Sequence, residues 1–402
     1  MKQLIIRRNY LDKIFKYLGK EMIIVLTGQR RVGKSYLLKQ FYQEKIKEPD
    51  SNIIYIDKEK REFDFIRNYQ NLNDYIESKF VKDKHNYILI DEVQDIAEFE
   101  RSVRGYRTEE NADVIITGSN AKMLSGELST IIGGRFKEIY IQPLSYEEFL
   151  TFHSLDDNDD SLTQYINLGG MPGLNKIGLH EDDVREYQKD IYNTVLLKDV
   201  IMRNNIRNVN FLENLVLYLA DNTGKIISAN NVSKYMKSNG ENISASVILN
   251  YLNYLSDAYI INKVNRYDVH GKRLFDSNEK YYFEDNGIRN AIAGGTREGD
   301  VEKVIENVVY QNLVRLGYEV FVGQLQSSEI DFVCTKPNGE KIYVQVSYLI
   351  VNEETRKREF GNLMKIQDNY PKYVVSMTPL ITNNDYEGIK HIHLRNFLKN
   401  GI

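Results

Sequence analysis

Five apolar runs in the first third of the chain constrain its fold more than any other feature. The runs lie at residues 22–26, 52–57, 86–91, 113–118 and 138–141. Segments long enough for helices separate them, at residues 35–47, 71–81, 98–107 and 121–131. Apolar strands that alternate with helices are typical of a parallel sheet covered on both faces. The first third therefore predicts an α/β fold built on a parallel sheet.

The loop after the first run carries the pattern of a phosphate-binding P-loop, the Walker A motif. It lies between a predicted strand and a predicted helix, which is the context that supports the motif. Its glycines let backbone N–H groups surround phosphates, and the helix N-terminus adds partial positive charge. We expect Lys34 to bridge the β- and γ-phosphates and the Ser35 hydroxyl to bind Mg²⁺. The predicted nucleotide-binding residues are Gly28, Gln29, Arg30, Arg31, Val32, Gly33, Lys34, Ser35 and Tyr36.

Two adjacent carboxylates, Asp91 and Glu92, end the third apolar run in the manner of a Walker B motif. The strand would deliver Asp91 to the carboxyl edge of the sheet, where it can hold Mg²⁺ through water. Glu92 is placed to polarise the attacking water. A simple GTPase switch does not need this second carboxylate, whereas an ATPase with its own catalytic base does. The alternative is an acidic pair at the N-terminus of a helix.

Polar residues also follow the fourth run, at residues 117–120. A side chain there would lie beside the γ-phosphate and help to orient the water. Asn120 and Ser119 are the candidates, and an ordinary N-cap for the next helix is the alternative.

Composition excludes several classes of protein. The 402 residues exceed one ordinary domain, and a net charge of -4 argues against a globally basic nucleic-acid-binding protein. The single cysteine, Cys334, rules out an intramolecular disulfide and a zinc site built on several thiolates, which favours a reducing, cytoplasmic location. We find no apolar run near the roughly 20 residues of a membrane helix and no signal-peptide pattern.

The pattern changes after the fifth run. Residues 145–206 are mainly helical and begin with a capping box at residues 145–148. Residues 207–289 show three short helices and two strands, an order similar to that of a winged helix. Residues 290–402 read as a small unit of helix, three strands, helix and strand.

Short motifs occur in a fixed order along almost the whole chain. They lie at residues 26–35, 91–94, 117–120, 133–135, 143–149, 169–172, 197–200, 281–287 and 329–332. As an ordered set they resemble bacterial and archaeal AAA+-type P-loop ATPases that carry a C-terminal domain of unknown function. The resemblance implies an ATPase core at 1–144, a helical lid at 145–206, a winged-helix-like module at 207–289 and a PD-(D/E)xK nuclease-like domain at 290–402.

The same resemblance implies further roles in nucleotide hydrolysis. Asn120 or Ser119 resembles the sensor residue of AAA+ ATPases. Arg135 resembles an arginine finger that reaches the nucleotide of a neighbouring subunit, which implies a homo-oligomer. The alternative is an arginine that packs on its own sheet edge or pairs with Glu138.

In the nuclease-like domain, the resemblance assigns carboxylates that would hold Mg²⁺. They are Glu306 on the first helix and Asp331 on a strand, with Glu329 on the same face as Asp331. The Glu-x-Lys position reads Gln345-Val346-Ser347, so one acidic ligand and the cationic helper are both replaced. We therefore expect a degenerate nuclease fold that serves in binding.

The combined prediction is an ATP-binding, Mg²⁺-dependent ATPase whose nucleotide state repositions the C-terminal domains. DNA and an unidentified protein both remain open as partners, because charges in the two C-terminal domains are nearly balanced. The predicted recognition helix at residues 244–256 contains no Lys or Arg. The rival functions are a metal-dependent DNA nuclease under ATP control and a nucleotide-dependent, protein-binding regulatory switch.

Overall fold

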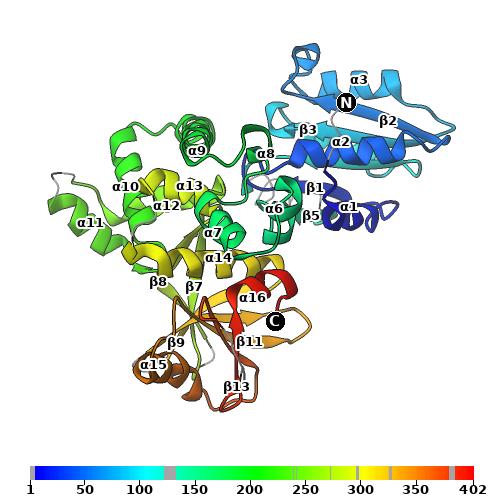
Figure 1. Cartoon of the computed structure of the whole chain (residues 1–402). Helices are drawn as coiled ribbons and strands as arrows, with labels where there is room; N and C mark the ends of the chain where they lie inside the picture. The colour runs from blue at the N-terminus through cyan, green and yellow to red at the C-terminus, as the bar shows by residue number, and fades with distance from the viewer. Residues whose placement is uncertain are drawn as a thin grey trace. The chain divides into compact units, whose positions relative to one another are not determined.

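The computed structural model describes residues 5–121, 133–238, 240, 242–271, 273–295, 298–325, 328–379 and 385–402. The chain forms two compact units (Figure 1): residues up to 142 with 257–259, and residues 143–256 with 260–402. The boundaries proposed at 206 and 289 fall inside the second unit and stay predictions. The helix expected at 121–131 lies outside the described residues apart from its first position.

All five strands expected in the first unit are confirmed, and they form one parallel sheet. They are β1 (Ile23–Thr27), β2 (Ser51–Asp57), β3 (His85–Asp91), β4 (Ala112–Thr117) and β5 (Phe136–Tyr140). The order across the sheet is β2-β3-β4-β1-β5. Strand β4 therefore separates the strand that leads into the P-loop from the strand that ends in Asp91.

Helices cover both faces of this sheet (Figure 1). They include α1 (Arg8–Phe15), α2 (Lys34–Lys45), α3 (Tyr69–Lys79) and α4 (Phe99–Tyr106). Leu72 of α3 and Val103 of α4 belong to an apolar cluster with Ile90 of β3. On the opposite face, Phe41 of α2 packs edge-on against Tyr87. Burial on both faces explains why every residue of β1 and β4 is buried and most of them are apolar.

The second unit combines helices with a larger sheet. Its helices include α6 (Tyr146–His153), α7 (Asp159–Leu168), α8 (Leu174–Ile177), α9 (Glu181–Val195), α10 (Val209–Asp221), α11 (Ala229–Ser238), α12 (Ala245–Asp257), α13 (Asn286–Ala293), α14 (Val301–Arg315), α15 (Glu353–Met364) and α16 (Leu394–Asn400). Its strands include β6 (Ile226–Ile227), β7 (Ile261–Asp268), β8 (Arg273–Phe283), β9 (Glu319–Gln324), β10 (Glu329–Thr335), β11 (Lys341–Ser347), β12 (Lys372–Ser376), β13 (Asp385–Tyr386) and β14 (Ile389–His393).

The capping box predicted at the start of α6 is confirmed. The Ser145 hydroxyl accepts a hydrogen bond from the Glu148 N–H at 3.1 Å, and the Glu148 carboxylate accepts one from the Ser145 N–H at 2.9 Å. The helix α9 begins at Glu181 and continues after Val195 as a π-helix over Leu196–Met202.

A single sheet contains strands from both sides of residue 289, where the sequence analysis placed a domain boundary. Its strand order is β13-β14-β12-β11-β10-β9-β7-β8-β6. Strand β7 pairs with β8 as an antiparallel hairpin and with β9 in parallel, with Arg266 opposite Val322. The hairpin expected of a winged helix is therefore continuous with the strands of the C-terminal α/β part.

Two motifs far apart in the sequence meet in this unit. The Asp285 carboxylate accepts hydrogen bonds from the backbone N–H groups of Gly170 at 2.7 Å and Ile288 at 2.9 Å. It thereby caps α13 and holds the glycine turn after α7. Burial raises the pKa of Asp285 to about 6, although these N–H donors act in the opposite direction. Among the described residues, no helix is both long and apolar enough to span a membrane.

Candidate functional site

The P-loop connects β1 to α2 and has the backbone that phosphate binding requires. Gly28 has φ 135°, and a Cβ there would clash with the carbonyl oxygen of Ile141, so only glycine fits. Gly33 has φ 102° and lies at the N-cap of α2. The buried Lys34 side chain donates to the carbonyl oxygens of Gly28 at 2.8 Å and Gln29 at 3.0 Å. The ammonium group is thus held inside the curve of the loop.

The other predicted loop residues have different surroundings. Gln29 and Val32 are buried, whereas Arg31 and Tyr36 are exposed. The Arg30 guanidinium lies 3.9 Å from the carboxylate of Glu59. Val32 is therefore part of the core, whereas Arg31 and Tyr36 lie at the surface.

Arg7 holds the backbone of the P-loop by hydrogen bonds, a role that the sequence analysis did not predict. Its buried guanidinium donates to the carbonyl oxygens of Val32 and Gln142, both at 3.1 Å. Nothing in the local pattern around Arg7 indicates this role, because its partners are distant in sequence.

Asp91 lies at the end of β3, where the fold brings it to the Walker A helix. Its carboxylate is hydrogen-bonded to the Ser35 side chain, and it accepts a hydrogen bond from the Thr117 hydroxyl at 2.5 Å. Burial raises the pKa of Asp91, while the hydrogen bonds to Thr117 and Ser35 oppose that rise. A hydroxyl and a carboxylate oxygen are ligands that suit Mg²⁺. Ser35 and Asp91 therefore fit the ion that the sequence assigned to them.

Thr117 is a second residue that sequence reasoning missed. It ends β4, and its hydroxyl also accepts a hydrogen bond from the backbone N–H of Glu92 at 2.9 Å. It therefore positions both acids of the Walker B motif. The feature that could have indicated this role is the position of Thr117 at the end of β4, the strand between β1 and β3.

Glu92 is buried and has a left-handed backbone, with φ 54°. This conformation is uncommon for a residue other than glycine, and it costs on the order of 1 kcal/mol. Its carboxylate accepts a hydrogen bond from the Gln94 side-chain amide. The alternative, an acidic pair at the start of a helix, agrees with the position of Glu92 directly before the short helix at Val93–Asp95, although its side chain makes no capping hydrogen bond there.

Ser119 and Asn120 follow β4 and are both buried. The helix that they would cap under the alternative reading lies largely outside the described residues. Both residues are buried just after Thr117, where β4 ends, and both therefore stay candidates for orienting water.

Arg135 is exposed at the edge of the sheet where the strands begin, whereas the P-loop lies at the edge where they end. It directly precedes β5, which runs parallel to β1, and its carbonyl oxygen accepts a hydrogen bond from the Ile23 N–H at 3.2 Å. Glu138 instead accepts a hydrogen bond from the Thr27 hydroxyl at 2.6 Å. Within the described ranges, Arg135 makes no ion pair with Glu138.

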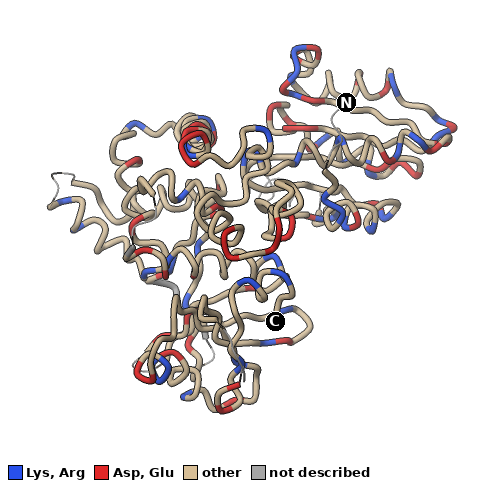
Figure 2. Tube along the Cα trace, viewed as in Figure 1, with Lys and Arg blue, Asp and Glu red and all other residues tan. Residues whose placement is uncertain are grey.

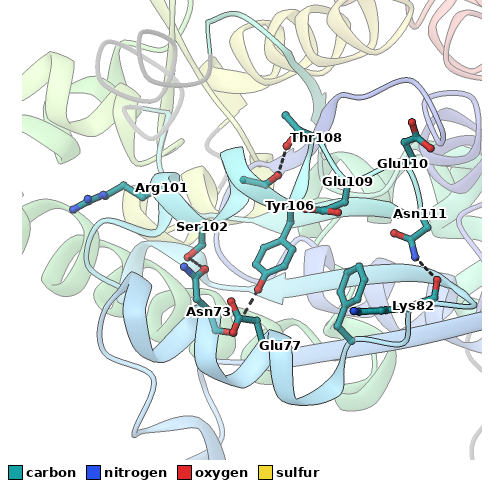
Figure 3. A pocket seen from close by; sticks show the side chains of 12 residues that line it. Asn73, Glu77, Lys82, Arg101, Ser102, Tyr106, Thr108, Glu109, Glu110 and Asn111 are labelled. Atoms are coloured by element: carbon teal, nitrogen blue, oxygen red, sulfur yellow. Dashed lines mark hydrogen bonds between the residues drawn. The ribbon is translucent and has the colours of Figure 1, made fainter.

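A large open pocket lies away from the P-loop, along α3 and α4 (Figure 3). Its volume is about 1050 Å³, and its lining includes Asn73, Glu77 and Tyr106. Part of its polar lining is satisfied internally, since the Ser102 hydroxyl hydrogen-bonds the Asn73 side chain at 2.6 Å. No residue of the Walker motifs lines this pocket, so it is separate from the nucleotide site.

The second unit brings the predicted nuclease-like residues together around a lysine that the sequence analysis missed. Lys280 of β8 lies 3.0 Å from Glu306, 2.7 Å from Glu329 and 3.8 Å from Asp331, measured from its ammonium nitrogen to carboxylate oxygens. Gln345 lies beside them, and its side-chain oxygen accepts a hydrogen bond from the Asp331 N–H at 3.4 Å. A cation is therefore present even though Ser347 replaces the expected lysine.

The parallel sheet, the P-loop at the end of β1 and the acids at the end of β3 define a P-loop protein of the AAA+ class. A family model described as an AAA domain matches residues 20–150, and a domain of unknown function (DUF8612) matches residues 159–299. An uncharacterized protein of Haemophilus influenzae is 34% identical over 405 residues, covering 99% of both chains. The chain therefore belongs to a family of proteins in which an AAA domain precedes a domain of unknown function.

More distant similarity extends to archaea. Uncharacterized protein MJ1544 of Methanocaldococcus jannaschii is 28% identical over 385 residues, which cover 92% of this chain and 84% of that protein. Among solved structures, Cdc6p from Pyrobaculum aerophilum superposes with a TM-score of 0.35 and 14% identity, over 73% of this chain and 94% of that one. At this TM-score the superposition is loose.

Proposed function

We propose that the protein binds ATP with Mg²⁺ in the P-loop and hydrolyses it. The observation that carries this proposal is the meeting of Ser35 and Asp91 beside the loop that encloses the Lys34 ammonium. Lys34 binds the phosphates, and Ser35 and Asp91 hold the metal. When bound, Mg²⁺ neutralises charge that develops on the phosphates.

Glu92 is the proposed catalytic base. Its carboxylate accepts a proton from the attacking water, and Thr117 holds the backbone that presents it. Asn120 and Ser119 orient the water. Gln94 donates to only one oxygen of the Glu92 carboxylate, so the other oxygen can accept the proton from water.

Lys34→Ala tests the nucleotide site. We expect ATP binding to weaken and turnover to fall at least about 100-fold, since the ammonium that contacts the phosphates is removed. The measurements are binding of a fluorescent ATP analogue and phosphate release. Lys47→Ala, at an exposed position beyond α2, should behave as wild type. Equal binding and turnover in Lys34→Ala and wild type would contradict the site assignment.

Arg135 is proposed to act on the nucleotide of a second copy of the chain. Its exposure at the sheet edge away from the P-loop supports this role. Arg135→Ala should then lower turnover about 10³-fold, and wild-type turnover per subunit should rise with protein concentration. Lys137→Ala, also on that edge, is the control.

Mixing two inactive variants distinguishes action in trans from action in cis. Arg135→Ala retains an intact Glu92, and Glu92→Gln retains an intact Arg135. If the arginine acts in trans, the mixture regains turnover that neither variant has alone. No regain in the mixture, with both proteins folded, would exclude a trans role.

We further propose that nucleotide state changes the arrangement of the second unit. Figure 2 shows acidic and basic residues interspersed along both units, so charge does not single out DNA as the partner. Comparing turnover with and without DNA at several salt concentrations distinguishes the partners. Salt-sensitive stimulation favours DNA, and its absence favours a protein-binding switch.

A further inference from the structure

Three carboxylates of the second unit form a largely buried cluster with a single ammonium group at its centre. The acidic cluster comprises Glu306 of α14 and Glu329 and Asp331 of β10, and Lys280 of β8 contacts all three. The Lys280 side chain is only 4% exposed. Tyr282, two residues along β8, donates its hydroxyl hydrogen bond to Glu306 as well.

Each of the three carboxylates already has at least one oxygen engaged by a donor. One Glu306 oxygen accepts hydrogen bonds from both Lys280 and Tyr282. One Asp331 oxygen faces Lys280, and the other accepts a hydrogen bond from the Val346 N–H at 2.8 Å. The side-chain oxygen of Gln345 faces the Asp331 N–H. Among the described residues, no group of three acidic, histidine or cysteine side chains has an arrangement that could hold a metal ion.

A metal-dependent nuclease centre needs two cationic positions, one for the metal and one for the lysine that assists water. Here one ammonium group occupies the space between all three carboxylates. A divalent ion at about 2.1 Å from these oxygens would lie against the ammonium and be repelled by it. The cluster therefore does not fit the metal that the resemblance implies.

We infer that Lys280 is the resident cation of the acidic cluster, which fastens β8 to α14 and β10 by ion pairs and takes no divalent metal. This role adds a side-chain connection to the β7–β9 pairing that joins the hairpin to the C-terminal α/β part. It also explains why Gln345 and Ser347 can replace an acid and a lysine without leaving the buried acids unpaired.

Electrostatics are consistent with a permanent ion cluster. Burial alone would lower the pKa of Lys280, but the charges of Glu306, Asp331 and Glu329 raise it above its ordinary value. Burial and the neighbouring Glu306 charge raise the pKa of Asp331 well above its usual range. The charged form of Lys280 is thus favoured by the three carboxylates around it.

The test measures Mn²⁺ binding by electron paramagnetic resonance on the full chain without nucleotide. Asp91→Asn is included in every protein to remove the metal site at the P-loop. We expect this parent to bind no Mn²⁺ at the acidic cluster at micromolar concentrations. Adding Lys280→Met should create a Mn²⁺ site at least ten times tighter, because three carboxylates lose their resident cation, and Asp331→Asn should remove it.

Lys263→Met is the matched control. Lys263 pairs with Glu279 at 2.7 Å on the same hairpin, outside the acidic cluster, so its loss should leave Mn²⁺ binding unchanged. Lys280→Met should melt at a lower temperature, and Mn²⁺ should raise that temperature in Lys280→Met alone.

Two results would overturn the inference. One is Mn²⁺ binding by the parent protein that disappears in Asp331→Asn, and this measurement stands even if Lys280→Met does not fold. The other is a folded Lys280→Met protein that binds Mn²⁺ no better than the parent. Cleavage of plasmid DNA by the wild type with Mn²⁺, lost in Asp331→Asn, would count with the first result.

Discussion

Glu92→Gln should bind ATP as the wild type does and turn it over at least about 100-fold more slowly. Glutamine is nearly isosteric with glutamate, and its amide can still receive the contact at Gln94 through the side-chain oxygen. It cannot accept a proton from water. Because Lys34, Ser35 and Asp91 are unchanged, the phosphate and metal contacts of the site remain. The variant should therefore accumulate with ATP bound.

Single-turnover kinetics and nucleotide binding separate the two parts of this prediction. Glu98→Gln is the control, since Glu98 is exposed at the start of α4 and pairs with Arg101 at 2.9 Å. It should keep wild-type turnover. If Glu92→Gln lost ATP binding, the residue would be structural, and if it kept full turnover, the base would lie elsewhere.

Gly287→Ala should destabilise the second unit by about 3 kcal/mol. A Cβ at Gly287 would lie 2.6 Å from the carbonyl carbon of Leu168, and it would also collide with the Gln188 side-chain amide. That amide donates to the Leu168 carbonyl oxygen at 2.5 Å, so the methyl group would break a buried hydrogen bond. The midpoint of urea unfolding, followed by circular dichroism, measures the effect.

Gly361→Ala provides a control of opposite sign in the same unit. Gly361 lies in α15, and a Cβ there meets no atom within 4 Å. Alanine should therefore stabilise the helix by about 0.5–1 kcal/mol. An unchanged unfolding midpoint in Gly287→Ala would contradict the close approach of Gly287 to Leu168 and Gln188. It would show that α7, α9 and α13 can move apart at little cost in free energy.

The sheet and the nucleotide site of the first unit were largely predictable from sequence. An apolar strand followed by Gly-x₄-Gly-Lys-Ser and a helix is a local pattern, and the structure has β1 before this loop and α2 beginning at Lys34. The Walker B acids follow from the same logic, because parallel strands end at one edge of the sheet. Thr117 was less visible, since its role depends on β4 lying between β1 and β3.

The second unit was predictable in its elements but not in its connections. The strands β10 and β11 and the helix α14 lie close to their predicted bounds. Sequence periodicity does not reveal which strands pair across long separations, so the parallel pairing of β7 with β9 was not expected. The contact of Gly170 with Asp285 likewise joins residues too far apart for any local pattern.

Sequence alone predicted a P-loop core and proposed Lys34, Ser35 and Asp91 as its phosphate and metal ligands, because these proposals depend on local spacing at the ends of two strands and the start of one helix. It also showed that Gln345 and Ser347 depart from a nuclease pattern. Only the tertiary structure decided what replaces the missing cation. Lys280 reaches Glu306, Glu329 and Asp331 through sheet pairing between strands distant in sequence, and the cost of burying unpaired carboxylates requires such a partner.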